Sequence, residues 1–125
     1  MRRPLKPEEI ELNNYSIKRL KEEIVDLELS LEENKLALEE GIDLAYKEQI
    51  KNYKKIIQES KKGSYESKLA NLKLRIIKNN LPKQKRNYEQ LIKEIENKII
   101  FDKNQIDILI QQIKKGVEVK EMKSV

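Results

Sequence analysis

Turn-forming residues are nearly absent from this chain, and this scarcity limits its possible folds more than any other feature. Between Glu8 and Lys115 the only glycines and prolines are Gly41, Gly63 and Pro82. A β-sandwich or barrel needs a turn about every ten residues, so all-β folds are disfavoured. Charged residues make up 39% of the chain and aromatic residues 5%, a composition typical of long helices and coiled coils. The sequence therefore predicts an all-α protein.

The strongest interruption of the chain is the segment 61–64, which reads Lys-Lys-Gly-Ser. Its Gly63 is able to end one helix, and its Ser64 is able to cap the next. We therefore expect two helical legs over residues 8–60 and 65–115, folded back on each other as a long antiparallel hairpin. In such a hairpin, residues whose numbers add to about 125 face each other.

The expected domain organisation follows from this hairpin. One helical domain spans residues 8–116, since Gly116 follows a basic last turn as a C-terminal capping glycine does. A basic lead-in over residues 1–7 precedes it, and a short, weakly patterned segment over residues 117–125 follows as a flexible tail.

Apolar residues recur every three or four positions along both legs, as in an antiparallel coiled coil. The seam residues that we expect to hold the helices and an oligomer together are Ile17, Leu20, Ile24, Leu27, Leu31, Ile92, Ile95, Ile99, Ile106, Leu109 and Ile113. After Leu38 the spacing slips, and the expected seam continues through Ile42, Tyr46, Gln49, Tyr53 and Ile56. The second leg is expected to begin its seam with Tyr65, Leu69, Leu72 and Ile76.

Two weak points of the legs fall opposite each other in the expected pairing. The register slip lies near Gly41, which would face residues 83–85, directly after Pro82. Both glycine and proline weaken a helix interior. We interpret this coincidence as a shared hinge near Gly41 and Pro82. The alternative is that both legs break there and form four shorter helices.

Polar residues interrupt the seam at Asn13, Asn34 and Asp102. Buried polar seam residues often fix the register or the oligomeric state of a coiled coil at some cost in stability. We favour this interpretation; the alternative is a loose, hydrated seam.

Apolar residues also occur away from the expected seam, and a single two-helix hairpin would leave them exposed. They are Leu29, Leu36, Ile77, Leu91, Ile100, Ile108 and Ile110. Exposed apolar surface of this kind marks an interface. We therefore expect a homodimer that packs into a helical bundle.

Charge is strongly segregated along the chain. Residues 1–46 hold 7 basic and 12 acidic residues, whereas residues 47–86 hold 13 basic and 3 acidic ones. Residues 87–125 balance at 7 of each, so the formal net charge is only +5. We call residues 47–86 the basic head. A surface of this kind attracts polyanions and can release counterions from a phosphate backbone.

The candidate anion-binding residues of the basic head are Lys54, Lys55, Lys61, Lys62, Lys68, Lys73, Arg75, Lys78, Lys83, Lys85 and Arg86. Tyr46, Tyr53 and Tyr88 have seam spacing, so we expect them to pack rather than to stack on bases. Two alternatives remain open. The lysines can form an ordinary solvated face, or the acidic first leg can pair with the basic head of a second molecule.

The chain contains no Cys and no His. Disulfides, thiolate or imidazole metal sites and the ordinary catalytic triad are therefore excluded. Three scattered glycines do not form a phosphate-binding loop. Carboxylate pairs such as Glu22 and Asp26 become an acid and a base only in a pocket that separates their pKa values. We expect no enzyme activity, no cofactor and no bound metal.

Neither end of the chain suggests a membrane or export segment. Its basic start leads into Glu8 and Glu9 rather than into an apolar segment,. No apolar run exceeds three residues, so we expect no membrane span and a cytoplasmic location,. The abundance of Lys, Ile, Asn and Glu resembles that of proteins from AT-rich bacterial genomes and their phages.

These features predict a non-enzymatic coiled-coil protein whose basic head binds an anionic partner such as DNA, RNA or a nucleoprotein complex. The alternative is a protein-protein adaptor or small inhibitor, of phage or mobile-element origin, that docks an apolar helix face on a larger protein. In that alternative the off-seam residues Ile100, Ile108 and Ile110 carry the contact.

Overall fold

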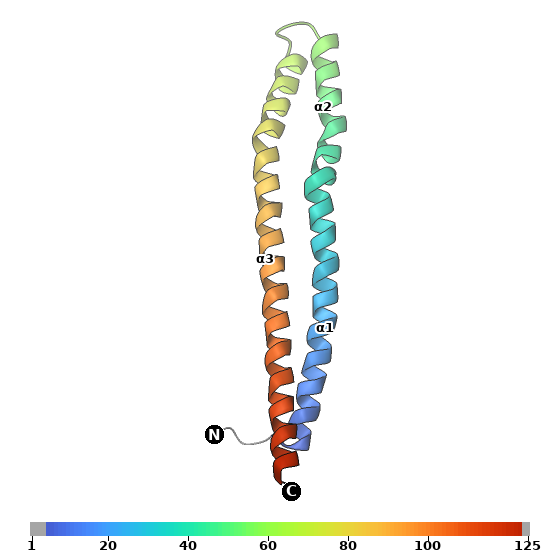
Figure 1. Cartoon of the computed structure of the whole chain (residues 1–125). Coiled ribbons are helices and arrows are strands. Elements are labelled where there is room, and N and C mark those ends of the chain that lie inside the picture. The colour runs from blue at the N-terminus through green and yellow to red at the C-terminus, as the bar shows by residue number, and fades with distance from the viewer. Residues whose placement is uncertain (1–4, 124–125) are drawn as a thin grey trace. The chain divides into compact units, whose positions relative to one another are not determined.

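The structure is a computed structural model that describes residues 5–123, with side chains placed for residues 5–115. These residues are almost entirely helical and contain no strand (Figure 1). The elements are α1 (Pro7–Leu36), the π-helical turn η1 (Ala37–Gly41), α2 (Ile42–Glu59) and α3 (Tyr65–Lys123). The predicted all-α class is confirmed.

The sequence explains the start of α1, but it does not place the end of α3. Helix α1 begins at Pro7, whose fixed φ suits the first helical position, and the Glu9 carboxylate accepts a hydrogen bond from the Lys6 backbone N–H at 3.1 Å,. Helix α3 continues past Gly116 to Lys123, so that glycine does not end it as expected. The expected lead-in and tail lie partly outside the described residues, which exclude 1–4 and 124–125.

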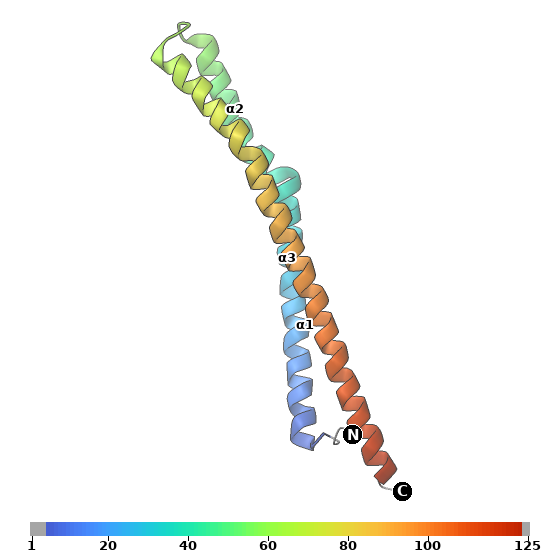
Figure 2. The ribbon, with the colours of Figure 1, turned by 90° about the vertical axis from the view of Figure 1, so that its left-hand side faces the viewer.

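The chain divides into two compact units. The terminal unit consists of Met1–Leu31 and Glu94–Val125, and the turn unit consists of Glu32–Lys93. In the turn unit, α2 and the first part of α3 lie side by side and are joined by the segment 60–64, as the views in Figures 1 and 2 show. The turn unit is therefore a helical hairpin, as predicted from the segment 61–64.

Gly63 serves the turn itself rather than the end of the preceding helix. The last residue of α2 is Glu59, and Ser60 after it has an extended backbone (φ −89°, ψ 151°). The Ser60 N–H still donates a hydrogen bond to the Ile56 carbonyl at 2.9 Å. The Ser64 N–H then bonds to the Lys61 carbonyl at 3.0 Å, which closes a four-residue turn with Gly63 at φ 82°. A positive φ at this third position defines a type II turn and favours glycine.

The expected cap of α3 is present. The Ser64 hydroxyl accepts a hydrogen bond from the backbone N–H of Ser67 at 3.3 Å, and the Ser64 carbonyl accepts the N–H of Lys68 at 3.0 Å. A serine in this position satisfies a donor that the first turn of a helix leaves free. The first turn of α3 is therefore anchored at the point where the chain reverses.

The irregularity expected near Gly41 is a π-helical turn. The Ile42 N–H bonds to the Ala37 carbonyl, one residue further back than in an α-helix, and Gly41 itself keeps helical angles. This turn accommodates one extra residue and shifts the helix face that follows, which accounts for the slip in apolar spacing. Pro82 lies inside α3, which is unbroken around it. The four-helix alternative is thus not observed; a hinge motion at these points stays a prediction.

The core of the terminal unit lies between α1 and the later part of α3. Its buried residues are Ile17, Ile24, Ile95, Ile99 and Ile106, and they are flanked by the half-buried Leu20, Leu27, Leu31, Leu109, Ile110 and Ile113. The Asn13 side-chain amide donates a hydrogen bond to Gln112 Oε1 at 3.3 Å, and the numbers of these two residues add to 125. The two segments therefore pack antiparallel in the expected register.

The legs of the turn unit also pair close to the expected register. The Gln84 amide donates to the Tyr46 hydroxyl at 2.8 Å, and Lys85 Nζ lies 3.1 Å from Asp43 Oδ1. The segments that follow Gly41 and Pro82 are therefore neighbours, as the sequence predicts.

The expected seam is wrong at the start of α3. The buried residues there are Ser67, Ala70 and Ile77, whereas the expected Leu69, Leu72 and Ile76 are 38%, 44% and 42% exposed. Both sets have helical spacing, so apolar periodicity alone does not choose between them. The buried set contains the small side chains of Ser67 and Ala70, whereas the larger Leu69, Leu72 and Ile76 keep part of their surface exposed.

A similar correction applies to α2. Ile50 and Ile57 are half-buried, whereas the expected seam residues Gln49 and Ile56 are exposed. Ile50 and Ile57 continue the helix face of Ile42, Tyr46 and Tyr53 at spacings of three and four, as the expected pair does, so apolar periodicity alone does not choose between them,. Ile42, Tyr46 and Tyr53 keep the inward positions predicted for them.

Candidate functional site

The basic candidates all belong to the turn unit. Two are on α2 (Lys54 and Lys55), two are in the connecting turn (Lys61 and Lys62), and seven are on α3 (Lys68, Lys73, Arg75, Lys78, Lys83, Lys85 and Arg86). All are exposed except Lys85, which is half-buried. The structure thus gathers these side chains on one unit and leaves them accessible to solvent.

Two of these lysines form ion pairs within the described part of the chain. Lys55 Nζ lies 4.0 Å from Glu59, with both side chains largely exposed, so solvent screens this contact strongly,. Lys85 Nζ lies closer to Asp43, at 3.1 Å, and links α3 to α2. We therefore regard Lys85 as partly committed to the fold of the turn unit.

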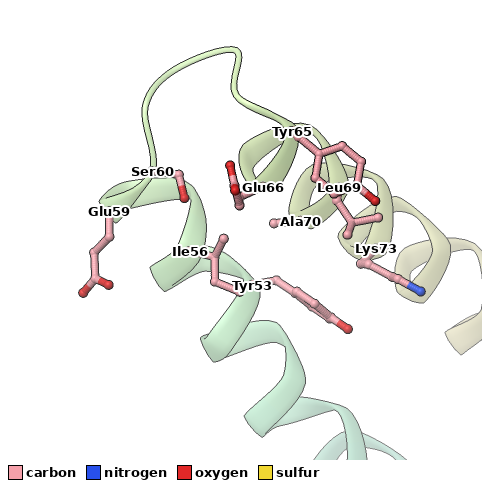
Figure 3. A pocket seen from close by; sticks show the side chains of 9 residues that line it. All are labelled: Tyr53, Ile56, Glu59, Ser60, Tyr65, Glu66, Leu69, Ala70 and Lys73. Carbon is pink, nitrogen blue, oxygen red and sulfur yellow. The ribbon is translucent and has the colours of Figure 1, made fainter.

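A groove opens between α2 and α3 next to the connecting turn, with a volume of about 450 Å³ (Figure 3). We call it the turn groove. Its lining residues are Tyr53, Ile56, Glu59, Ser60, Tyr65, Glu66, Leu69, Ala70 and Lys73. The Tyr53 ring reaches from α2 toward α3 in Figure 3, and the small Ala70 side chain leaves the space open. Apolar side chains dominate this lining, which suits a protein side chain better than a phosphate.

The tyrosines of this region differ in their exposure. Tyr46, Tyr53 and Tyr88 are half-buried, in keeping with packing positions. Tyr65, directly after the turn, is 74% exposed. Its ring is the aromatic surface of the turn groove that a partner reaches most easily.

An exposed apolar face extends from the turn groove along α3. Tyr65, Leu69, Leu72 and Ile76 follow one another at helical spacing, and each is at least 38% exposed. We call these four residues the turn stripe. Sequence reasoning assigned them to the seam and so missed them as a surface. Ala70 and Ile77 each follow a residue of the turn stripe by one position and so form a second apolar face. This second face is the signal in the sequence that the outward face was available to a partner.

Most of the residues expected to form an oligomer seam are used within one chain. Ten of them lie in the core of the terminal unit, and Ile92 is buried in the turn unit. Their packing against a second chain is therefore not needed to bury them.

The off-seam residues are exposed with two exceptions. Leu29, Leu36, Leu91, Ile100 and Ile108 are exposed, as expected. In contrast, Ile77 is buried and Ile110 is half-buried against the core of the terminal unit. Ile77 is inward for the reason given above, since the true seam at the start of α3 contains Ala70 and Ile77.

Asp102 is the most unusual residue of the terminal unit, because its side chain is fully buried in an apolar seam. Its Oδ1 lies 3.3 Å from Lys98 Nζ, but neither carboxylate oxygen has a hydrogen-bond partner among the described residues. Lys98 also lies 3.6 Å from Glu23 and 5.0 Å from the centre of the Phe101 ring. The contact with Asp102 first, and that with Glu23 after it, raise the pKa of Lys98 above its ordinary value of 10.5, against a smaller lowering by desolvation.

The polar seam residues behave differently from one another. Asn13 bonds to Gln112, and Asn34 is half-buried and lines a small recess with Asn87, Tyr88 and Leu91.

Among the side chains of residues 5–115, no group of three or more His, Cys, Asp or Glu is arranged to hold a metal ion. In the same range, no helix has the length and apolar character needed to cross a membrane.

Comparison with protein-family models, with curated proteins and with solved structures finds no match to this chain.

Proposed function

We propose that this protein is a non-enzymatic interaction protein whose basic head, residues 47–86, binds an anionic partner. The partner is a nucleic acid or a nucleoprotein complex. The observation that carries the proposal is the exposure of ten of the eleven candidate basic residues on the turn unit, within a segment of 13 basic and 3 acidic residues. Such a surface gains affinity by releasing counterions from a phosphate backbone.

Binding of this kind is largely independent of sequence. Phosphate contacts position a protein on nucleic acid but do not read bases. The basic residues lie on helices and in a short turn, and they do not form a recognised groove-reading motif. We therefore expect the protein to bind DNA or RNA of many sequences, and we propose that it does so in the cytoplasm.

Salt dependence tests this proposal. A surface that neutralises about six phosphates loses about a thousandfold in affinity between 50 and 200 mM salt. We expect this loss in fluorescence anisotropy titrations of the full chain with labelled duplex DNA and with single-stranded RNA. Affinity that is weak at 50 mM salt, or strong but insensitive to salt, would contradict the proposal.

A second candidate function is supported by the apolar lining of the turn groove. In this alternative the protein is an adaptor or small inhibitor that docks on a larger protein without touching nucleic acid. A pull-down from a cell extract, with and without nuclease, separates the two functions. Nuclease removes the partners if the basic head binds nucleic acid, and leaves them if the contact is with protein.

Self-association is the third part of the proposal. We propose a homodimer, because several large apolar side chains stay exposed in both units after the seam is formed,. Light scattering at tens of micromolar tests this state directly. A clean monomer would remove the dimer from the account and leave polyanion binding unaffected.

A further inference from the structure

The turn groove and the turn stripe together form an apolar surface that the turn unit does not cover. Tyr65, Leu69, Leu72 and Ile76 of α3 contribute to it, and Ile56 adds a contact from α2. The groove provides a recess of about 450 Å³ beside this stripe (Figure 3). Contiguous exposed apolar side chains next to a recess favour docking of a helix that presents its own apolar side chains.

The charge around this surface specifies the character of that helix. Residues 51–78 contain nine basic residues and only two acidic ones, Glu59 and Glu66. Lys68, Lys73 and Arg75 are exposed on the same helix as the turn stripe. A fitting partner helix therefore has apolar anchors at helical spacing with acidic residues around them, because opposite charges at the rim steer and orient association.

The chain itself contains a helical segment with these properties. In α1, Val25 and Leu29 are one turn apart and are 55% and 60% exposed. Residues 22–33 include six acidic residues and no basic one. Glu22 and Asp26 precede Leu29 by seven and three positions, so they share its side of the helix, and both are exposed,.

We infer that a second copy of this chain occupies the turn groove, with the acidic face of its α1 around Val25 and Leu29 packed on the turn stripe. This inference rests on the self-association in the proposed function and names the two surfaces that form it. A dimer with twofold symmetry contains this contact twice, once in each direction, and such a closed dimer is the proposed homodimer.

The contact has a dependence on salt that an apolar seam would not show. Because the acidic face meets a basic rim, raising the salt concentration screens the attraction between the copies. Nucleic acid bound to the basic head competes for the same lysines. We therefore expect self-association to be strong at 50 mM salt and to weaken at 500 mM salt or on addition of a polyanion.

Two surface substitutions test the inference by sedimentation velocity at 10–100 μM. Leu29→Lys disrupts the acidic face, and Leu69→Glu disrupts the turn stripe. Both positions are exposed, so we expect both variants to fold. Circular dichroism checks that they do. Each variant alone is expected to lose at least tenfold in association, the loss that follows from removing one well-buried leucine contact. Ile100→Lys, at an equally exposed position of α3, is the matched control and should associate as the wild type does.

Mixing the two variants gives the sharpest result. Each keeps the surface that the other has lost, so an equimolar mixture is expected to form a 1:1 complex although neither variant associates alone. The inference is overturned if the mixture stays monomeric, if both variants associate like the wild type, or if the wild type is a monomer at 100 μM in 50 mM salt. Anisotropy with labelled duplex DNA on the same samples reports separately on polyanion binding, which Leu29→Lys should not reduce.

Discussion

Asp102 and Lys98 show how a single buried charge can define the packing of the terminal unit. Asp102 is closed to solvent between apolar neighbours, and Lys98 provides the opposite charge from one helical turn earlier. A buried carboxylate is costly unless a cation neutralises it. A fully closed position argues against a loose, hydrated seam here. Lys98 lies on the same helix as Asp102, so their contact forms in any register, and the link to α1 is the contact of Lys98 with Glu23 at 3.6 Å. That Asp102 sets the register stays a prediction.

Replacing Asp102 and Lys98 singly should have opposite effects on stability. We expect Asp102→Leu to raise the free energy of unfolding by about 1 to 4 kcal/mol, because it replaces the buried charge by an apolar group while the remaining Lys98 ammonium is 47% exposed and keeps its contact with Glu23,. Lys98→Met should lower it, because it leaves the carboxylate buried without a cation. Urea denaturation measures both changes.

The combination of the two substitutions provides the control. In the Asp102→Leu background, Lys98→Met should have little further effect, because the charge that Lys98 neutralises is gone. Equal losses from Lys98→Met in both backgrounds would show that Asp102 is not its important partner. A loss of stability in Asp102→Leu would show that the carboxylate makes a favourable contribution after all.

At the scale of the helices, sequence periodicity predicted the terminal unit well and the turn unit less well. Ile17, Ile24, Ile99 and Ile106 belong to a longer apolar series with Leu20, Leu27, Leu31 and Leu109 than the few off-seam apolar residues form, so the seam there follows directly from the pattern. At the start of α3 two apolar faces compete, and the face bearing Ala70 is buried. Choosing between them requires the geometry of the turn, which periodicity does not contain.

Only part of the candidate site was predictable from the sequence, as was the case for the seam. Charge segregation along the sequence located the basic residues, because lysine side chains at a helix surface remain exposed wherever they are not paired. The turn groove was not predictable, since it depends on the small side chain of Ala70 opposite Tyr53. The register slip was visible near Gly41, but its form as a π-helical turn depends on the backbone hydrogen bonding of residues 37–42, in which the Ile42 N–H bonds to the Ala37 carbonyl.

Substitutions on the two apolar faces of α3 test which face is the seam. Ile77 is 7% exposed, so we expect Ile77→Ala to leave a cavity in the seam and to lower the free energy of unfolding by about 2 to 5 kcal/mol,. Leu69 is exposed, and Leu69→Ala should cost less than about 1 kcal/mol,. Thermal or urea unfolding shows which of the two variants loses more stability. A larger loss in Leu69→Ala would favour the seam expected from sequence periodicity.

At the scale of the whole molecule, the net charge of +5 conceals the feature on which the proposed function depends. The basic head contains 13 of the 27 basic residues but only 3 of the 22 acidic ones. The same lysines serve two roles in the account, since they attract a polyanion and surround the turn groove. Nucleic acid and a second copy of the chain should therefore compete for the turn unit.

The central claim is that the basic head, rather than the net charge of the chain, binds polyanions. A charge-reversed head variant converts six exposed residues to Glu: Lys61, Lys62, Lys68, Lys73, Arg75 and Lys78. A control variant converts six other exposed basic residues to Glu: Lys18, Arg19, Lys21, Lys103, Lys114 and Lys115. The two variants change the net charge of the chain by the same amount.

Anisotropy titration of both variants with labelled duplex DNA and single-stranded RNA at 100 mM salt is the most direct measurement. We expect the head variant to lose at least a hundredfold in affinity and most of its salt dependence, because it can no longer release counterions from the phosphates. The control variant should keep its affinity within about threefold, since exposed charges more than about 10 Å away are screened at this salt concentration. Equal losses in the two variants, or no loss in the head variant, would contradict the account.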